Sequence, residues 1–139
     1  MLITTDYTAD QLTEFRAMIE AQWSAVDAFD SEHEGSKLPP PVLAFVDDEV
    51  VGGLSFTWHN KPDSNVIGLW VNTVYVRPSR RHRGVASALL KKAVELTAQG
   101  YAEYGLYAYT DTAALYESNG WHLVNTIDAH SIYQYRKVS

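Results

Sequence analysis

Cysteine is absent from the sequence, which excludes disulfide bridges, thiolate zinc sites and a cysteine nucleophile. No apolar run approaches the roughly 20 residues of a membrane-spanning helix. The first residues, Met1–Asp6, have neither the basic nor the apolar region of a signal peptide. The five histidines show no regular ligand spacing, so we expect no metal site. Together these absences predict a cytoplasmic protein that does not enter a membrane.

Acidic residues are missing from one long segment. No Asp or Glu lies between Ser64 and Val94, although this segment holds six of the eleven Lys and Arg residues. They are Arg77, Arg80, Arg81, Arg83, Lys91 and Lys92. The chain as a whole has a formal net charge of −6, which argues against general nucleic-acid binding. With 46% apolar residues in 139, we expect one packed domain over residues 1–139 that carries a local anion site.

The N-terminal part of the chain predicts helix followed by loop. After a short strand at Leu2–Thr4, Thr8 and Gln11 fit a capping box that starts a helix. The apolar stripe of this helix consists of Leu12, Phe15, Ile19 and Trp23. A second short helix is expected within Ser24–Ser31, and the Pro-rich stretch Glu34–Pro41 predicts a loop.

Six further segments predict strands. They are Val42–Val46, Val50–Trp58, Val66–Val76, Leu106–Tyr109, Trp121–Thr126 and Ser131–Arg136. The Gly52-Gly53 pair inside the second of these marks a bend or bulge. The first two form a hairpin, which pairs antiparallel, as do the last two.

Two helices are expected among these strands. One has the apolar stripe Val85, Leu89, Ala93 and Leu96, with Gly100 as its C-cap. The other covers Ala113–Ser118, begins at Asp111 or Thr112 and stops at Asn119-Gly120. The strand–helix–strand connection around the longer helix implies a right-handed crossover and a parallel pair. The fold class is therefore α/β with a mixed (α+β) sheet of six to seven mostly antiparallel strands, a central parallel pair and about four flanking helices.

The segment from Val74 to Ser87 predicts a phosphate site. It follows the order strand, basic turn, small residues, helix, and the first amides of a helix are unpaired and bind anions readily. Gly84 lets the backbone approach an anion closely, and the neighbouring arginines suit a pyrophosphate. Neither a P-loop nor a G-x-G-x-x-G motif is present. By spacing alone, a solvated basic turn that caps an ordinary helix explains the pattern equally well.

The sequence Arg81-His82-Arg83-Gly84-Val85-Ala86 matches the pattern Q/R-x-x-G-x-G/A, and the chain thereby resembles the GNAT N-acetyltransferase superfamily. Leu69–Pro78 looks like the fourth strand of that family. Ala114–Trp121 is similar to its "lYe..GF" segment, with Trp in the Phe position. The expected order of elements is also that of the family, so the resemblance covers nearly the whole chain.

The resemblance implies acetyl-CoA as cosubstrate and direct transfer of acetyl to a primary amine in a ternary complex. Backbone groups of Val74, Tyr75 and Val76 would pair with the pantetheine arm, and the amide of Val76 or Val74 would stabilise the oxyanion. The pyrophosphate would lie on the amides of Arg81, His82, Arg83, Gly84, Val85, Ala86 and Ser87. Tyr116 matches the tyrosine that protonates the leaving thiolate in many relatives.

Two parts of the reaction stay open at this stage. Many relatives carry a glutamate on the fourth strand, whereas Trp70–Thr73 contains no carboxylate. The general base could be Glu32, His33, Glu34, His59 or water. The acceptor, a small-molecule or peptide amine, would meet the segment before the Pro-rich loop, which suits a cationic amine or is simply a solvated face. That segment offers Gln22, Trp23, Asp27, Phe29, Asp30, Glu32 and Glu34.

Other functions compete with this interpretation. The missing glutamate is compatible with a non-catalytic acyl-CoA-binding sensor or interaction module. An acidic interaction domain with an incidental basic turn is a third hypothesis, and it predicts no CoA binding. The last hairpin, with Tyr133 and Tyr135 expected on its surface, is a candidate edge for a homodimer.

Overall fold

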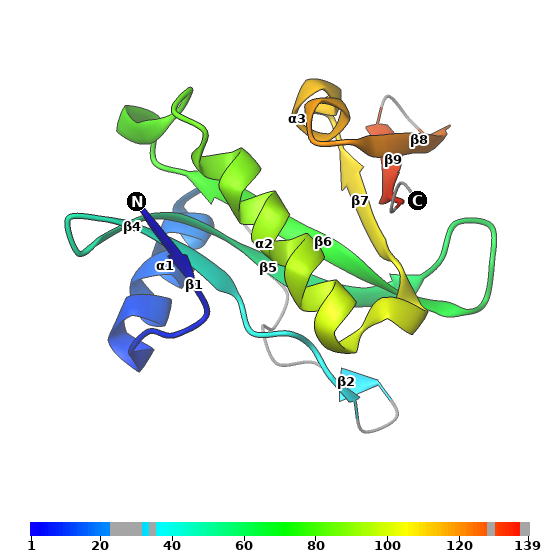
Figure 1. The fold of residues 1–139 in the computed structure, drawn as a ribbon, viewed down its shortest axis with the longest axis horizontal. Coiled ribbons are helices and arrows are strands. Elements are labelled where there is room, and N and C mark those ends of the chain that lie inside the picture. Colours follow the sequence, from blue (N-terminus) through cyan, green and yellow to red (C-terminus); the bar gives the residue numbers. More distant parts are fainter. Residues whose placement is uncertain (23–31, 34–35, 128–129, 137–139) are drawn as a thin grey trace.

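The larger of the two sheets in the described residues contains seven strands. The computed structural model describes residues 1–22, 32–33, 36–127 and 130–136. The strands are β1 (Leu2–Thr4), β4 (Val42–Val46), β5 (Glu49–Asn60), β6 (Ile67–Val76), β7 (Leu106–Thr110), β8 (Trp121–Ile127) and β9 (His130–Tyr135). Their order is β1-β4-β5-β6-β7-β9-β8, and only β6 and β7 pair in parallel (Figure 1). The predicted mixed sheet with a central parallel pair is confirmed.

Three α-helices and two 3₁₀ turns accompany this sheet in the described residues. Their bounds are α1 (Ala9–Gln22), η1 (Pro78–Arg80), α2 (Val85–Gly100), η2 (Ala102–Tyr104) and α3 (Ala113–Ser118). About four helices were expected, but the segment for the additional one, Ser24–Ser31, lies outside the described residues, as does Trp23. No described helix is both long enough and apolar enough to cross a membrane.

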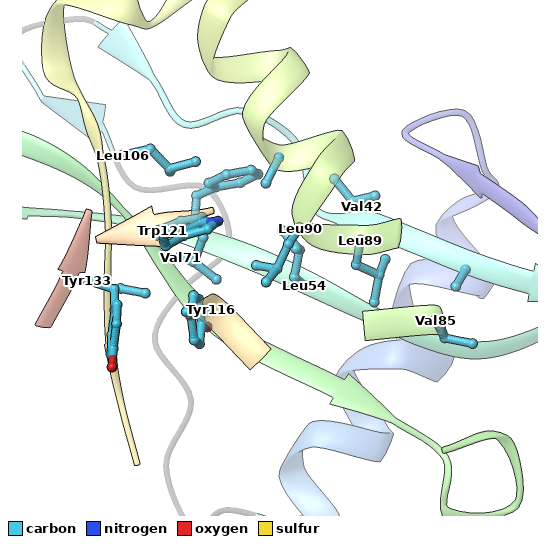
Figure 2. Close-up of a cluster of buried hydrophobic side chains, with 14 of the residues drawn as sticks. Val42, Leu54, Val71, Val85, Leu89, Leu90, Leu106, Tyr116, Trp121 and Tyr133 are labelled. Atoms are coloured by element: carbon cyan, nitrogen blue, oxygen red, sulfur yellow. The ribbon is translucent and has the colours of Figure 1, made fainter. Parts of the chain in front are cut away.

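The helices cover opposite faces of the sheet. Successive residues of a strand point to opposite faces, and on β4 Val42 and Ala44 pack with α2. Leu43 and Phe45 pack instead with residues of α1. Figure 2 shows the α2 side of the core, where Leu90 lies over the sheet beside side chains of the central strands. The sheet therefore has an α2 face and an α1 face, each with its own buried cluster.

The capping box at the start of α1 is confirmed. The amide of Gln11 donates to Thr8 Oγ1 at 3.1 Å, and the amide of Thr8 donates to Gln11 Oε1 at 2.8 Å. Phe15 and Ile19 of the predicted stripe are fully buried against the sheet. A bulge is confirmed beside Gly52, because the register of β4 and β5 shifts between Ala44 and Phe45.

Three expectations were wrong. The predicted loop Glu34–Pro41 contains β3 (Ser36–Lys37), which pairs with β2 (Glu32–His33), and the hydroxyl of Tyr101 donates to the Lys37 carbonyl at 2.8 Å. Gly100 is the last residue of α2 and not its C-cap, since the next amide, that of Tyr101, donates to Thr97 O at 2.8 Å.

The third error concerns the last hairpin. Tyr133 was expected on the surface, but its side chain is only 2% exposed because it packs beneath α3 against Tyr116. Tyr133 also lies on β9, and the edge strand on this side of the sheet is β8. The reason offered for a dimer edge at this tyrosine is thereby lost.

Candidate active site

Strand β6 is paired on both sides over only part of its length. Only Leu69–Val71 of β6 pair with β7, whereas pairing with β5 continues to Val76. Between these parts the register with β5 shifts, which leaves Asn72 as an extra residue. A bulge of this kind bends the strand, and β6 and β7 diverge toward their carboxyl ends (Figure 1). The second part of β6 therefore faces an opening in the sheet.

Two residues of β6 direct their backbone groups into this opening. The amide of Arg77 donates to Val51 O at 2.8 Å, so that residue is bonded to β5. Because bonding direction alternates along an antiparallel strand, the groups of Val76 and Val74 point away from β5. The Val76 carbonyl already accepts a hydrogen bond from Arg81 Nε at 2.9 Å. Since β7 pairs with β6 no further than Val71, the amides of Val74 and Val76 have no strand partner on this side in the described part of the chain.

The turn between β6 and α2 exposes a series of backbone donors. The backbone has positive φ at His82 (63°) and Gly84 (82°), and α2 begins without a side-chain cap. Within the described ranges, the amides of residues 82–87 have no hydrogen-bond partner. A Cβ added at Gly84 would meet nothing within 4 Å, so the space beside this glycine is free. Such a turn, together with a helix N-terminus, forms a concave site for an anion.

The arginines of this segment do not all face the same site. Arg80 and Arg81 line the cavity described below, whereas Arg83 does not. The Arg81 guanidinium also lies 5.7 Å from the centre of the Tyr75 ring. Arg77 instead binds Glu14 of α1 at 3.1 Å and the Val50 carbonyl at 2.9 Å. The basic cluster seen in the sequence therefore divides into ligand-facing and structural residues.

A cavity of about 850 Å³ occupies the opening between β6 and β7 and extends to the start of α2. The predicted site residues that line it are Val74, Tyr75, Val76, Arg81, His82, Gly84, Val85, Ala86, Ser87 and Tyr116. The structure thus brings together every residue assigned to the cofactor or to catalysis except Arg83. Their contacts with a ligand stay a prediction.

Tyr116 of α3 lies in the wall of this cavity. Its side chain is 5% exposed, stacks on Tyr133 with 5.9 Å between ring centres, and meets Trp121 edge-on at 5.1 Å. Burial raises the pKa of the Tyr116 phenol above its ordinary value. Its hydroxyl has no partner in residues 1–22, 32–33, 36–127 and 130–136. The phenol therefore stays protonated and is available to a ligand.

Asn119 connects the end of α3 to the phosphate turn. Its Nδ2 donates to Ser87 Oγ at 3.0 Å and to the Leu115 carbonyl at 2.8 Å. These contacts hold the helix that carries Tyr116 against the first turn of α2. The sequence predicted Asn119 only as a helix stop, because a hydrogen bond to a residue 32 positions away has no local signal.

Several cavity residues had not been assigned to the site. They are Ile19, Val71, Asn72, Thr73, Tyr109, Thr110, Asp111, Thr112, Leu115 and His130. The residues that follow β7 could have been found, since ligands of such sheets bind beyond the carboxyl ends of parallel strands. His130 and Ile19 carry no comparable signal, because their proximity depends on how distant elements pack.

The structure separates one candidate base from the site. His59 lines a second cavity of about 280 Å³, next to Trp70, and does not line the first. Glu34 and the acceptor residues Trp23, Asp27, Phe29 and Asp30 lie outside the described residues, as do the side chains of Gln22, Glu32 and His33.

The comparisons with known proteins identify the family. Residues 41–123 match the profile of the acetyltransferase (GNAT) domain, and the chain belongs to this family. No curated protein matches the sequence significantly.

Solved structures with low sequence identity share the fold. Escherichia coli ElaA has a TM-score of 0.70 and 15% identity, over 97% of this chain and 100% of that one. Arabidopsis thaliana NAA60 in complex with acetyl-CoA has a TM-score of 0.64 and 13% identity, over 96% and 98%. The aminoglycoside 6′-N-acetyltransferase AAC(6′)-IG of Acinetobacter haemolyticus has a TM-score of 0.65 and 18% identity, over the full length of both chains.

Proposed function

We propose that this chain, acting as a single domain, transfers the acetyl group of acetyl-CoA to a primary amine. Membership of the GNAT family supports acetyl-CoA as the donor, as does the complex of the structurally similar NAA60 with acetyl-CoA. The name of the aminoglycoside 6′-N-acetyltransferase supports an amine as the acceptor. The observation that carries the proposal is that one cavity contains both the donor-rich turn and the Tyr116 hydroxyl.

In this proposal the backbone binds the donor. The unpaired amides of residues 82–87 hold the pyrophosphate, assisted by the side chains of Arg80 and Arg81, since hydrogen bonds to a charged acceptor are stronger than neutral ones. The Arg81 amide, which was also expected to bind it, donates instead to Pro78 O at 3.4 Å. The pantetheine arm lies along Val74, Tyr75 and Val76 in place of a neighbouring strand. Because Arg81 Nε donates to the Val76 carbonyl, this carbonyl is not available to the arm.

The same cavity supplies the chemistry of acetyl transfer. A neutral amine attacks the thioester carbonyl, and the amide of Val76 or of Val74 stabilises the developing oxyanion. The carbon–sulfur bond then breaks, and Tyr116 protonates the leaving thiolate. A tyrosine whose pKa is raised by burial enters this step in its protonated form. Holding both substrates in the cavity contributes further to the rate.

Replacement of Tyr116 by Phe tests this function. In a thiol-release assay with acetyl-CoA and a panel of primary amines, Tyr116→Phe should lower kcat by about 10²–10⁴-fold, the usual contribution of a general acid. The KM for acetyl-CoA should change little, since the ring remains. Tyr135→Phe is the matched control, because Tyr135 packs on the same Trp121 but lies outside the cavity. An unchanged rate in Tyr116→Phe would reduce this residue to a packing role.

A non-catalytic acyl-CoA-binding module is the alternative function. It is favoured by one observation: β6 places Asn72 and Thr73 in the cavity wall, and no carboxylate. Both functions predict that acetyl-CoA binds. The alternative predicts binding by calorimetry without thiol release against any amine of a broad panel that includes small cationic amines and peptides.

A further inference from the structure

The cavity is lined by residues from both faces of the sheet. Val85 and Tyr116, which belong to the buried cluster of the α2 face, line one part of it. Ile19 and Tyr75, which belong to the cluster of the α1 face, line another. The donor-rich turn leads into α2, so a CoA bound there enters from the α2 face. The α1 face then remains for the second substrate.

His130 lies on this second face. It is the first residue of β9, two positions before Ile132, and Tyr109 follows Tyr107 by two positions on β7. Ile132 and Tyr107 pack with Trp70 in a cluster away from α2, and alternation places His130 and Tyr109 on the same side. The rings of Tyr109 and His130 stack with centres 4.8 Å apart and planes inclined by 22°.

The Tyr109–His130 stack forms a defined wall of the cavity. Tyr109 is held by a hydrogen bond from its hydroxyl to the Ile127 carbonyl at 3.4 Å, while half of its side chain remains exposed. His130 is half-buried, and its ring is fixed in direction by the tyrosine face. An imidazole in this position is accessible to a ligand and yet restrained, which suits a group that must meet a reacting atom.

We propose that His130 is the general base of the reaction, a step that rests on the proposed acetyl transfer. The acceptor nitrogen forms a bond to the thioester carbon and becomes positively charged. His130 takes one proton from this nitrogen, the carbon–sulfur bond breaks with its electron pair on sulfur, and Tyr116 protonates the thiolate. The imidazolium then loses its proton to solvent, and the phenolate of Tyr116 regains one. Amine and thioester thus yield amide and thiol without a further reactant.

Other groups around the cavity fit this role less well. The titratable and charged residues that line it are Tyr75, Arg80, Arg81, His82, Tyr109, Asp111, Tyr116 and His130. Arg80, Arg81 and His82 belong to the phosphate turn, and Tyr75 is buried beside Arg81. Asp111 is an exposed residue before α3, next to a Thr110–Thr112 hydroxyl pair at 2.8 Å. Imidazole is also the side chain most often used as a catalytic base.

The test compares three histidine variants by the pH dependence of kcat/KM for the amine. Two acceptors of different amine pKa are used. A fall of kcat/KM at low pH (the acidic limb of the profile) that has the same midpoint with both acceptors reports a group of the enzyme and not the amine. His130→Gln should lower kcat/KM by about 10²–10⁴-fold and abolish that limb, with the KM for acetyl-CoA within about twofold of wild type. The two control variants, His59→Gln and His122→Gln, should keep the wild-type pH profile. His122 is an exposed residue of β8.

Further variants decide the remaining outcomes. If His130→Gln loses folded structure by circular dichroism, His130→Ala is assayed with added imidazole, and restored turnover supports the proposal. A His130→Gln rate within about threefold of wild type with an intact limb overturns it, as does loss of the limb in Asp111→Asn alone. If wild type binds acetyl-CoA but acetylates no amine, the proposed function fails and the base assignment with it. Failure confined to His130 leaves acetyl transfer standing.

Discussion

The two longer helices of this protein begin in opposite ways. At the start of α1, Thr8 and Gln11 bond to each other's backbone amides at 3.1 Å and 2.8 Å. At the start of α2, Gly84 offers no side chain, and the amides of residues 82–87 have no partner in the described chain. Both starts leave the same orphan donors in principle. At α1 the capping side chains bond to these donors, whereas at α2 the donors remain available to a ligand.

Charge follows the same division. The first turn of α1 contains the acidic residue Asp10, whose negative charge interacts favourably with the positive end of the helix dipole. The first turn of α2 contains no acidic residue, and Arg80 and Arg81 face the cavity beside it. A helix start that supplies its own negative charge is complete without a ligand. One that lacks it and adds cations is matched to an external anion.

The largest effect expected from breaking this comparison is that of Gly84→Glu. A carboxylate at Gly84 repels the pyrophosphate. We expect this repulsion to cost about 2 kcal/mol of binding free energy, which weakens acetyl-CoA binding about 30-fold. Isothermal titration calorimetry measures the dissociation constant.

Gly120→Glu is a matched control for this variant. Gly120 has the same φ as Gly84, 82°, and equally open space around it, but it lies outside the cavity. Both variants should therefore lose similar stability from backbone strain, of about 1–2 kcal/mol. Equal acetyl-CoA affinity in the two variants would contradict the phosphate assignment.

A smaller effect separates two arginines of the same segment. Arg80→Ala should weaken acetyl-CoA binding about tenfold. A hydrogen bond to a charged group contributes about 1.5–3 kcal/mol, and we expect the lower end because this side chain is partly solvated. Arg77→Ala should leave the affinity unchanged, since Arg77 binds Glu14 and Val50. Calorimetry on both variants checks this. An equal loss in both would indicate a general electrostatic effect in place of a defined contact.

At the start of α1 the expected change affects stability alone. Thr8→Ala removes the acceptor for the Gln11 amide and should lower the free energy of unfolding by about 1 kcal/mol. Urea denaturation measures this value. Acetyl-CoA affinity should be unaffected, because this capping box lies outside the cavity. A change in affinity without a change in stability would mean that the two helix starts are not independent.

The smallest effect concerns the residue before this capping box. The Tyr7 hydroxyl donates to the Pro41 carbonyl at 2.7 Å, and burial raises the pKa of Tyr7 to about 12. Between its ordinary pKa of about 10 and 12, the folded state keeps a proton that the unfolded state has lost. The contribution of Tyr7 to stability is therefore complete below this window and declines as pH rises through it. Tyr7→Phe should reduce the decline measured by denaturation across the window; an identical slope would contradict the assignment.

The sequence predicted most of what local patterns control. The capping box, the strand order around the crossover and the turn at Gly84 follow from residue types within a few positions of each other. The family resemblance added Tyr116, whose sequence neighbours alone indicate only a packed aromatic. Gly100 was assigned wrongly because the helix end is fixed by η2, which continues the turn beyond the glycine.

What the sequence did not predict depends on packing between distant elements. Tyr133 was misplaced because alternation on β9 does not reveal that α3 covers one of its faces. The placement of His130 beside Tyr109 arises from the pairing of β7 with β9. The separation of His59 from the cavity arises from the length of β5. The roles of Arg77 and Arg81 could not be distinguished either, because their partners lie on α1 and at the end of β6.

A crystal structure of the protein with acetyl-CoA tests the central claim most directly. We expect both phosphates of the pyrophosphate within hydrogen-bond distance of amides in residues 82–87, and the thioester sulfur next to the Tyr116 hydroxyl. The start of α1 should carry no ligand. A CoA whose pyrophosphate lies elsewhere on the surface, with the amides at the start of α2 bound only to water, would contradict the account.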